Sequence, residues 1–290
     1  MDDHSLAHAV GRIYRLIPNR MPGKRRFAKL CLQPLFRKVG CRSTVTLNSG
    51  SKFHCPLEDW IPWQIYLHGC YWAEREVEPI LLDTARQSQV VFDVGAHMGY
   101  YTVQFAARTR GAVHSFEPNP RSFDCLQRNV ALNAIENASL NNIGVSSQAG
   151  RLTLRVPDTG NSGSASFSQQ YAADASDSVD VNVVTLADYC DSRQIRQVDM
   201  IKVDVEGHEL EVLKGLDPLL DQHGVWRVFA EWNATTASHS TYEELLHKFA
   251  GFGYVPWSIS QGRIVPFSGE PSSLVLFEAS EALTRKRAAA

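Results

Sequence analysis

The sequence V-V-F-D-V-G-A-H-M-G-Y-Y-T, residues 90–102, predicts a buried strand that turns directly into a helix. The apolar, β-branched residues of V-V-F-D-V are typical of a strand covered on both faces. Asp93 then lies at the carboxyl edge of the strand, where Gly95 and Gly99 allow a tight turn or the close approach of another molecule. The amides after Gly99 begin a helix whose positive end faces the same place. We therefore expect an α/β sheet that binds a ligand at this edge.

Two kinds of cofactor could bind at such a turn. A dinucleotide fold uses G-x-G-x-x-G, whereas this stretch has D-x-G-x-x-x-G, in which a carboxylate precedes the first glycine. That carboxylate would repel a pyrophosphate but would attract the ammonium group of S-adenosylmethionine. Downstream, V-H-S-F-E-P-N-P places Glu117 after a second short strand, where an acid can bind the ribose hydroxyls of either cofactor. An ordinary strand-to-helix turn with two surface acids is the alternative interpretation.

A third stretch, V-D-M-I-K-V-D-V-E-G-H-E-L-E-V-L-K-G-L over residues 198–216, predicts a strand that ends at Asp204 and a helix closed by K-G. Ligands of open α/β sheets bind outside the carboxyl ends of the strands. The turn would therefore bring Asp204, Glu206, His208 and Glu209 into one crevice. As an alternative, the two glutamates could stabilise the first turn of the helix and the histidine could cap it.

The next predicted strand, W-R-V-F-A-E-W-N over residues 226–233, delivers Glu231 and Asn233 to the same edge. Together with Asp204 they offer three oxygen ligands for Mg²⁺, an arrangement that resembles the site of the catechol-type methyltransferases. Glu231 could instead pair with a nearby base such as Arg227 or Lys202. A metal site is therefore expected only as an alternative to direct acid–base catalysis.

Strands and helices alternate between these motifs, as in a parallel βαβ series. The expected elements are a helix over residues 101–108, a strand over 112–116, a helix over 120–132 and a strand over 138–145. Residues 150–184 interrupt the series with R-L-T-L-R-V and V-D-V-N-V-V around a Gly/Ser-rich loop. This interruption predicts an inserted antiparallel pair of strands.

The composition is that of a folded protein with one large domain or one and a half ordinary domains. The chain has 290 residues, of which 44% are hydrophobic and 21% are charged. No apolar run is long enough to cross a bilayer, and the first twenty residues lack the core of a signal peptide. The six cysteines, at positions 31, 41, 55, 70, 125 and 190, form no C-x-x-C pair. Free thiols in a reducing cytoplasm are therefore expected.

Positive charge is concentrated at the start of the chain. Residues 1–42 hold ten Lys and Arg against two Asp, a balance of plus eight, so the rest of a chain with net charge −2 carries minus ten. Apolar residues recur there at helical spacing between prolines, namely Leu6, Val10, Ile13 and Ile17, then Phe27, Leu30 and Cys31. Such basic amphipathic helices could lie on an anionic membrane or partner. The alternative is a helical cap that docks on the acidic body with its bases in solvent.

Residues 43–89 are expected to form an entry or lid module. Alternating residues at 44–47 and 52–54 around N-S-G predict a β-hairpin. Five aromatic residues follow within thirteen positions, namely Trp60, Trp63, Tyr66, Tyr71 and Trp72. They suit either a core or the lining of a pocket, in which Tyr66, His68 and Glu74 would be the polar groups.

The motifs D-V-G-A-H-M-G-Y-Y-T, F-E-P-N-P and I-K-V-D-V-E-G-H-E-L-E-V-L-K-G resemble those of the FkbM-type family of S-adenosylmethionine-dependent methyltransferases. The resemblance covers about residues 65–278, and I-K-V-D-V-E-G-H-E is its most specific part. It implies a class I, Rossmann-like fold of seven strands, with the last strand antiparallel and helices on both faces. It also implies O-methylation of a hydroxyl on a glycan, a polyketide or another natural product. The first sixty residues depart from the family pattern.

The motifs and the resemblance together define the expected site. The residues expected to bind S-adenosylmethionine are Asp93, Gly95, Ala96, His97, Gly99, Tyr101, Thr102, Glu117, Pro118, Asn119 and Asp204. A sulfonium methyl is already activated, so the protein must align the acceptor oxygen, exclude water and accept a proton. His208, Asp204 or Glu206 could take that proton, and a histidine near its ordinary pKa suits the task at neutral pH.

Competing functions make different demands on the sequence. An NAD-binding oxidoreductase would need the missing G-x-G-x-x-G, and a non-catalytic binding module would have no reason to gather acids at one edge. We expect a small-molecule or glycan acceptor and no nucleic acid, and the oligomeric state stays open. The expected parts are a basic helical extension (1–42), the entry module (43–89), a methyltransferase domain (90–283) and a flexible tail (284–290). A cytoplasmic protein is expected, with peripheral membrane contact through the extension as an option.

Overall fold

The structure is a computed structural model that describes residues 9–11, 13–14, 16–17, 24–27, 31–32, 34, 36, 42–157, 162–169, 172, 175–222, 224–231, 239–267 and 274–280. Contacts along the chain divide it into two compact units. The smaller unit comprises residues 1–75 with 159–163, and the larger comprises residues 76–158 with 164–290. Within the described ranges, no helix combines the length and the apolar character that a membrane span requires.

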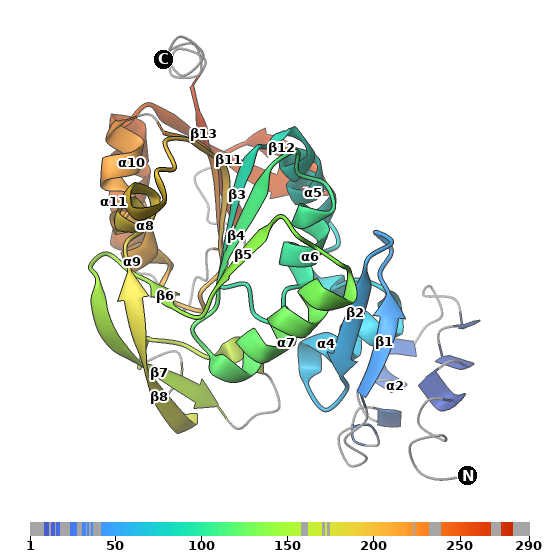
Figure 1. The fold of residues 1–290 in the computed structure, drawn as a ribbon. Coiled ribbons are helices and arrows are strands. Elements are labelled where there is room, and N and C mark those ends of the chain that lie inside the picture. The colour runs from blue at the N-terminus through green and yellow to red at the C-terminus, as the bar shows by residue number, and fades with distance from the viewer. Residues whose placement is uncertain are drawn as a thin grey trace. The chain divides into compact units, whose positions relative to one another are not determined.

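The larger unit is built on an eight-stranded sheet in the order β12-β11-β13-β10-β9-β3-β4-β5 (Figure 1). Its strands are β3 (Val90–Val94), β4 (Ala112–Phe116), β5 (Ala138–Asn141), β9 (Val198–Val203), β10 (Val225–Glu231), β11 (Tyr254–Ser260), β12 (Arg263–Pro266) and β13 (Leu274–Ala279). The five strands from β5 to β10 are parallel, and β13 is antiparallel to both of its neighbours. The predicted class I fold with an antiparallel last strand is confirmed. An eighth strand, β12, was not predicted; Gln261 and Gly262, both at positive φ, form the turn that joins it to β11.

Strand β3 occupies the middle of the parallel part of the sheet. The carboxylate of Asp93 on this strand therefore has neighbours on both adjacent strands. Asp93 is in register with Ser115 of β4 on one side and with Lys202 of β9 on the other. Residues in register on adjacent strands point to the same face. The sheet therefore places an acid, a hydroxyl and a base side by side next to the turn after β3.

Helices cover both faces of the sheet (Figure 1). One face carries α5 (Glu78–Gln87), α6 (Tyr100–Ala106) and α7 (Pro120–Leu132), and the other carries α8 (Leu186–Arg193), α9 (Glu209–Lys214), α10 (Asp217–Asp221) and α11 (His239–Gly251). The predicted helix over residues 120–132 is confirmed at both ends. It begins after Asn119, whose side chain accepts a hydrogen bond from the Arg121 amide at 3.1 Å, and Pro120 occupies its first position.

Aromatic packing on the α8 side explains why the β3 sequence is apolar. Phe92 has no exposed surface, and its ring centroid lies 5.6 Å from that of Phe116 and 5.9 Å from that of Tyr189, both edge to face. Val91 and Val94 are also buried, so β3 is covered on both faces as predicted.

The strand predicted over residues 138–145 is wrong as a single element. Strand β5 ends at Asn141, and the next two residues separate it from β6 (Gly144–Val145), which pairs with β8 and not with the main sheet. Asn142 donates a hydrogen bond of 2.8 Å to the Glu117 carbonyl. This bond ties the chain to the end of β4, so the following residues leave the sheet.

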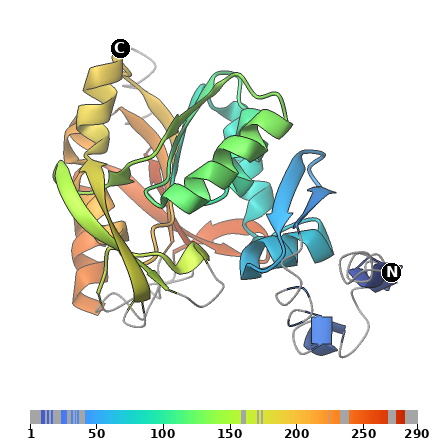
Figure 2. The same ribbon diagram turned by 60° about the horizontal axis from the view of Figure 1, so that its bottom comes forward.

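Residues 144–184, which we call the insert, form a separate three-stranded sheet in the order β6-β8-β7. Strands β7 (Gly150–Pro157) and β8 (Ala175–Val184) are antiparallel, which confirms the predicted pair, and the short 3-10 helix η3 (Ser162–Ser164) lies between them in the sequence. Figures 1 and 2 show the β7–β8 ribbon beyond the carboxyl edge of the main sheet. The insert is therefore placed at the edge where the predicted site lies.

The smaller unit contains the predicted hairpin, formed by β1 (Arg42–Thr46) and β2 (Lys52–Pro56), and helix α4 (Trp60–His68). Asp59 caps α4 by accepting a hydrogen bond from the Ile61 amide. Of the five aromatic residues singled out in the sequence, Trp63 and Tyr66 are buried, with exposed fractions of 3% and 4%. These two belong to the core of the unit. A lid role for residues 43–89 stays a prediction.

The structure differs from the sequence-based predictions at the start of the chain and at the start of the larger unit. The described N-terminal residues are helical at 9–11 and in α2 (Lys24–Phe27), but Ile13 is 62% exposed whereas Tyr14 is 2% exposed. The buried face therefore differs from the predicted one, and Leu6 and Leu30 lie outside the described residues. Helix α5, grouped with the entry module in the sequence, lies in the larger unit, where it contacts α6.

Candidate functional site

The turn after β3 is organised around a buried carboxylate. Asp93 accepts a hydrogen bond of 2.6 Å from the hydroxyl of Thr102 on α6, and that hydroxyl lies 2.8 Å from Ser115 Oγ. Burial raises the pKa of Asp93, while nearby Lys202 and the Thr102 bond act in the opposite direction. The other carboxylate oxygen, Oδ1, is buried and has no hydrogen-bond partner among the described residues. A buried acceptor without a partner is costly, so it suits a site that a ligand completes.

Two glycines of the motif are needed by the chain itself. Gly95 has a φ of +81°, and a Cβ there would lie 1.8 Å from the carbonyl oxygen of Asp204. Gly99 has a φ of +85°, and a Cβ there would lie 2.5 Å from Leu126 on α7. Of the two roles that the sequence allowed, the tight turn is the one that this geometry supports, because both glycines have positive φ and Gly95 also lies against the backbone of Asp204. The glycine at position 95 is what lets the turns after β3 and β9 meet.

Glu117 joins the turns after β3 and β4. Its Oε2 accepts a hydrogen bond of 2.7 Å from the His97 amide, and its Oε1 accepts one of 2.8 Å from the Asn119 amide. Burial raises the pKa of Glu117 to about 7 even though both amide bonds favour the ionised form. Each carboxylate oxygen can accept a second hydrogen bond, so the predicted ribose contact is compatible with this geometry. The Asn119 side-chain amide nitrogen is buried and has no partner in the described part of the chain.

A buried ion pair that the sequence analysis did not single out lies between β9 and α6. Lys202 is 3% exposed, donates a hydrogen bond of 2.8 Å to Asp204 Oδ2 and lies 5.0 Å from the ring centroid of Tyr101. The signal was present, because a lysine two residues before Asp204 on a strand must share its face. Lys202 is therefore part of the same cluster as Asp93 and Asp204.

The charge of Asp204 is set by its neighbours. Burial alone would raise the pKa of Asp204, but Lys202 and a hydrogen bond with the Glu231 side chain together lower it. The structure thus brings two of the three predicted metal ligands together, and Asn233 lies outside the described residues. No group of three His, Cys, Asp or Glu side chains that could hold a metal occurs in the ranges that the structure describes. The Mg²⁺ site consequently gains no support.

The turn between β9 and α9 is held by Glu209. Its carboxylate accepts hydrogen bonds from the Val205 amide at 3.1 Å and from the Gly207 amide at 3.0 Å. Burial raises the pKa of Glu209, which these amide bonds oppose. Glu206 occupies a left-handed conformation, with a φ of +53°, and its carbonyl accepts a hydrogen bond of 2.6 Å from Ser166 of the insert. Glu209 thus has the structural role that was the alternative interpretation for it.

His208 has different neighbours from Asp204. Its Nε2 lies 3.0 Å from the Ser146 hydroxyl, and its ring is edge to face with Phe167 at 5.0 Å. Burial lowers the pKa of His208, and nearby Glu211 acts against this shift. The crevice predicted to hold four ionisable groups therefore consists of two parts, one around Asp204 and one where His208 contacts the insert.

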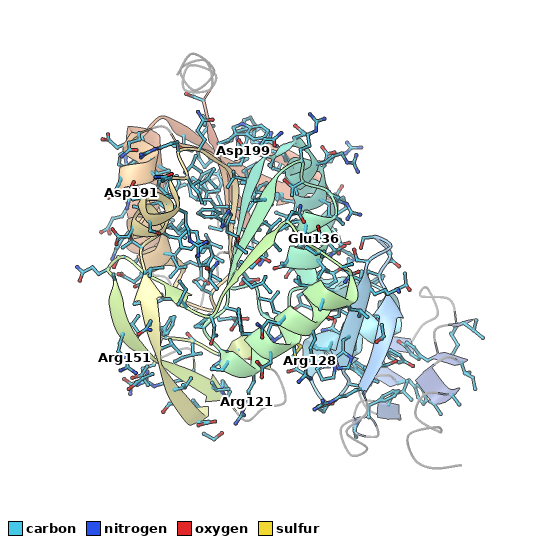
Figure 3. All side chains as sticks on the ribbon, viewed as in Figure 1. Arg121, Arg128, Glu136, Arg151, Asp191 and Asp199 are labelled. Carbon is cyan, nitrogen blue, oxygen red and sulfur yellow. The ribbon has the colours of Figure 1, made fainter. Side chains whose placement is uncertain are left out.

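An acid at the opposite edge of the sheet provides a contrast. Asp199, labelled in Figure 3, lies at the amino end of β9 and accepts hydrogen bonds from the amides of Gln89 at 2.7 Å and Val90 at 3.0 Å. This carboxylate fixes the start of β3. A substitution of Asp199 can therefore serve as a control for substitutions of the acids at the carboxyl edge.

The sequence model of the FkbM methyltransferase domain matches residues 93–256, more than half of the chain. Hexuronic acid methyltransferase AglP of Haloferax volcanii is 31% identical over 144 residues, which is 50% of this chain and 56% of that protein. Methyltransferase sdnD of Sordaria araneosa is 32% identical over 155 residues, 44% of this chain and 60% of that protein. The 31-O-demethyl-FK506 methyltransferase FkbM of Streptomyces tacrolimicus is 28% identical over 159 residues, 46% and 61% of the two chains.

The matched region of this chain spans less than two thirds of the length of each of these three relatives. The family match nevertheless begins at Asp93 and includes the complete turn after β9. The turns after β3 and β9 both lie within the matched residues. On the family match, this chain belongs to the FkbM methyltransferase domain family.

Proposed function

We propose that the protein transfers the methyl group of S-adenosylmethionine to a hydroxyl oxygen of a small-molecule or glycan acceptor. The observation that carries the proposal is the buried Asp93 carboxylate, whose Oδ1 lacks a partner among the described residues at the turn that the family motif defines. A nicotinamide cofactor is less compatible with it, because a carboxylate at this point would face the pyrophosphate.

The residues present fit the cofactor in charge and hydrogen bonding. Asp93 Oδ1 would accept a hydrogen bond from its ammonium group, and Glu117 would accept bonds from ribose hydroxyls. The Asn119 side-chain nitrogen is a buried donor that is also without a partner in the described ranges. When bound, S-adenosylmethionine supplies a methyl group that is already activated by the sulfonium.

The protein would then have to orient the acceptor hydroxyl and take its proton. Asp204, with its pKa held low by Lys202, is ionised at neutral pH and would accept a hydrogen bond from the hydroxyl. His208, with its pKa lowered by burial, is neutral at the same pH and can accept a proton. Because a hydroxyl has one proton to donate, only one of these groups can take it, and we propose His208 as the candidate base with Asp204 as the alternative. Direct catalysis is favoured over Mg²⁺, because the Lys202 ammonium 2.8 Å from Asp204 already supplies the positive charge there.

A groove on the insert is a candidate acceptor site. It has a volume of about 310 Å³, at the lower end for ligand sites. Its lining is mainly polar: Arg155, Gln169, Ala172, Ala175, Ser176, Asp177 and Ser178. Arg155 pairs through its backbone with Ser166, at 2.9 and 3.0 Å, and Ser166 is bonded to Glu206. The groove is thus linked to the turn after β9, and its hydroxyl, amide and guanidinium groups suit a hydroxyl-rich ligand. The names of two relatives, a hexuronic acid methyltransferase and a 31-O-demethyl-FK506 methyltransferase, support this class of acceptor.

Binding calorimetry on the full chain tests the cofactor. We expect binding of S-adenosylmethionine and none of NAD, and we expect Asp93→Asn to weaken that binding by about ten-fold or more, as for hydrogen bonds between charged groups. Asp199→Asn is the matched control, because this acid also accepts hydrogen bonds but lies at the other edge. Binding of NAD alone, or equal effects of the two substitutions, would overturn the cofactor assignment.

Methyl transfer tests the reaction. Labelled S-adenosylmethionine is incubated with the protein and fractionated cell extract, and mass spectrometry identifies the product and the methylated atom. We expect label on an oxygen, with activity retained after exhaustive chelation. His208→Gln should lower the turnover rate more than the cofactor affinity. Label on nitrogen or carbon would refute O-methylation, and loss of activity on chelation that Mg²⁺ restores would favour the metal-assisted alternative.

A further inference from the structure

The described start of the chain packs against α4 within the smaller unit through one side. A Cβ added to Gly11 would lie 2.7 Å from the Tyr66 ring of α4, so the helix backbone contacts that ring closely. Tyr14, three residues further on, is 2% exposed, and its ring lies 6.3 Å from that of His68. Residues three apart share a face of a helix. Gly11 and Tyr14 therefore define the docked face.

The other side exposes large apolar side chains. Ile13 is 62% exposed and Leu16 is 83% exposed, and they are again three residues apart. Phe27, at the end of α2, is 51% exposed. Among the described residues of the larger unit, the exposed large apolar side chains reach at most 41%. We call Ile13, Leu16 and Phe27 the apolar triad.

The sequence surrounds the apolar triad with bases. Arg12 and Arg15 each directly precede a member of the triad, and K-R-R precedes Phe27. Residues 1–42 carry plus eight, while the rest of the chain carries minus ten, since the total is −2. The surface combines exposed aliphatic and aromatic side chains with concentrated positive charge. A partner that is complementary to it must offer both an apolar environment and negative charge.

We propose that the apolar triad and its neighbouring bases form a binding surface for an anionic lipid bilayer. The bilayer interface meets both demands at once, because apolar side chains enter the acyl boundary while lysine and arginine contact anionic headgroups. A second copy of the chain that bound through this same surface is disfavoured as the occupant, because it would bring two segments of plus eight together. Nucleic acid would satisfy the bases but would offer the aliphatic side chains nothing to bury against. This surface is independent of the proposed methyl transfer.

Vesicle co-sedimentation of the full chain tests the proposal. The probes are vesicles of phosphatidylcholine alone and of phosphatidylcholine with phosphatidylglycerol, at low and high salt. We expect salt-sensitive binding to the anionic vesicles only. Ile13→Ser, Leu16→Ser and Phe27→Ser combined should reduce that binding by about ten-fold or more, because each loses apolar area that would enter the interface. Arg25→Gln with Arg26→Gln should weaken it as well.

Controls separate the other outcomes. Ile264→Ser removes a 37% exposed apolar side chain of the larger unit and should leave vesicle binding unchanged. The triple variant should keep the circular dichroism spectrum and the sedimentation coefficient of the wild type. Equal vesicle binding by wild type and triple variant would overturn the proposal. A lower mass for the triple variant in analytical ultracentrifugation would overturn it too, because it would identify the occupant as a second copy.

Discussion

Three acids at the carboxyl edge look alike in the sequence, but their pKa values shift in different directions because their neighbours differ. Burial raises the pKa of Asp93 and raises that of Glu117 to about 7, whereas the Lys202 ammonium helps to hold the pKa of Asp204 low. Only the register of β3 with β9 reveals that Lys202 stands beside both aspartates. The opposite directions of these pKa shifts are therefore a property of the fold.

Glu117 should make the stability of the protein depend on pH. Between its ordinary pKa of 4.5 and its folded value of about 7, the folded protein keeps a proton that the unfolded chain has lost. The contribution of Glu117 to stability therefore falls as the pH rises through this range. We expect the stability of wild type minus that of Glu117→Gln to fall by up to about 3 kcal/mol across it, as measured by urea denaturation. The unpaired amide that glutamine leaves is a constant offset, so a flat or rising difference would contradict the prediction.

Lys202 and Lys214 form ion pairs of equal length and unequal burial. Each ammonium lies 2.8 Å from a carboxylate, but the Lys202 side chain is 3% exposed and the Lys214 side chain is 48% exposed. Lys202→Met leaves Asp204, whose side chain is 24% exposed, without its ammonium partner and should cost up to about 3–5 kcal/mol, whereas Lys214→Met should cost at most about 1 kcal/mol. Denaturant titration of both variants measures the difference. Similar losses would mean that Asp204 is solvated when its partner is removed.

At the scale of elements, local signals predicted the strand at 112–116 and the helix at 120–132, because apolar alternation and the N-P start are encoded within each segment. The strand over 138–145 was wrong because its second half is decided by distant partners: Gly144 packs against Phe167 and Val183 of the insert. The split of the predicted crevice has the same origin. His208 contacts Ser146, which is 62 residues away in the sequence, and no local sequence pattern predicts this contact.

The bond between Ser166 and Glu206 should couple the insert to the site. Ser166 has no exposed surface, and its hydroxyl donates to the Glu206 carbonyl at 2.6 Å. If the groove binds the acceptor, Ser166→Ala should raise the acceptor KM by about 3- to 10-fold, the scale of one hydrogen bond, and leave the cofactor Kd unchanged. Thr153→Ala is the control, because it removes an exposed bond to Asp180 within the same β7–β8 pair. A change in cofactor Kd, or an equal effect of the control, would count against this coupling.

At the scale of the whole molecule, the sequence combines a basic start with an acidic remainder, and the described part of that start packs against α4 of the smaller unit. One side of the segment is a docked cap, since Tyr14, Leu32 and Phe36 are at most 3% exposed. The side chains of the apolar triad are exposed instead. Deleting residues 1–40 would therefore remove core side chains together with the proposed membrane surface, so point substitutions separate the two roles better than truncation does.

Phe36 and Phe27 allow that separation with one chemical change. Phe36 has no exposed surface and packs edge to face on Tyr66, with ring centroids 5.9 Å apart, whereas Phe27 is 51% exposed. Phe36→Ala should cost about 3–5 kcal/mol, since it opens a cavity in the core of the smaller unit. Phe27→Ala should change stability by no more than about 0.5 kcal/mol, since it touches the surface only. Vesicle binding should show the reverse order, with Phe27→Ala weakened and folded Phe36→Ala close to wild type. If Phe36→Ala proves neutral in denaturation, the docked face is absent in solution; if both variants bind vesicles like wild type, Phe27 does not contact lipid.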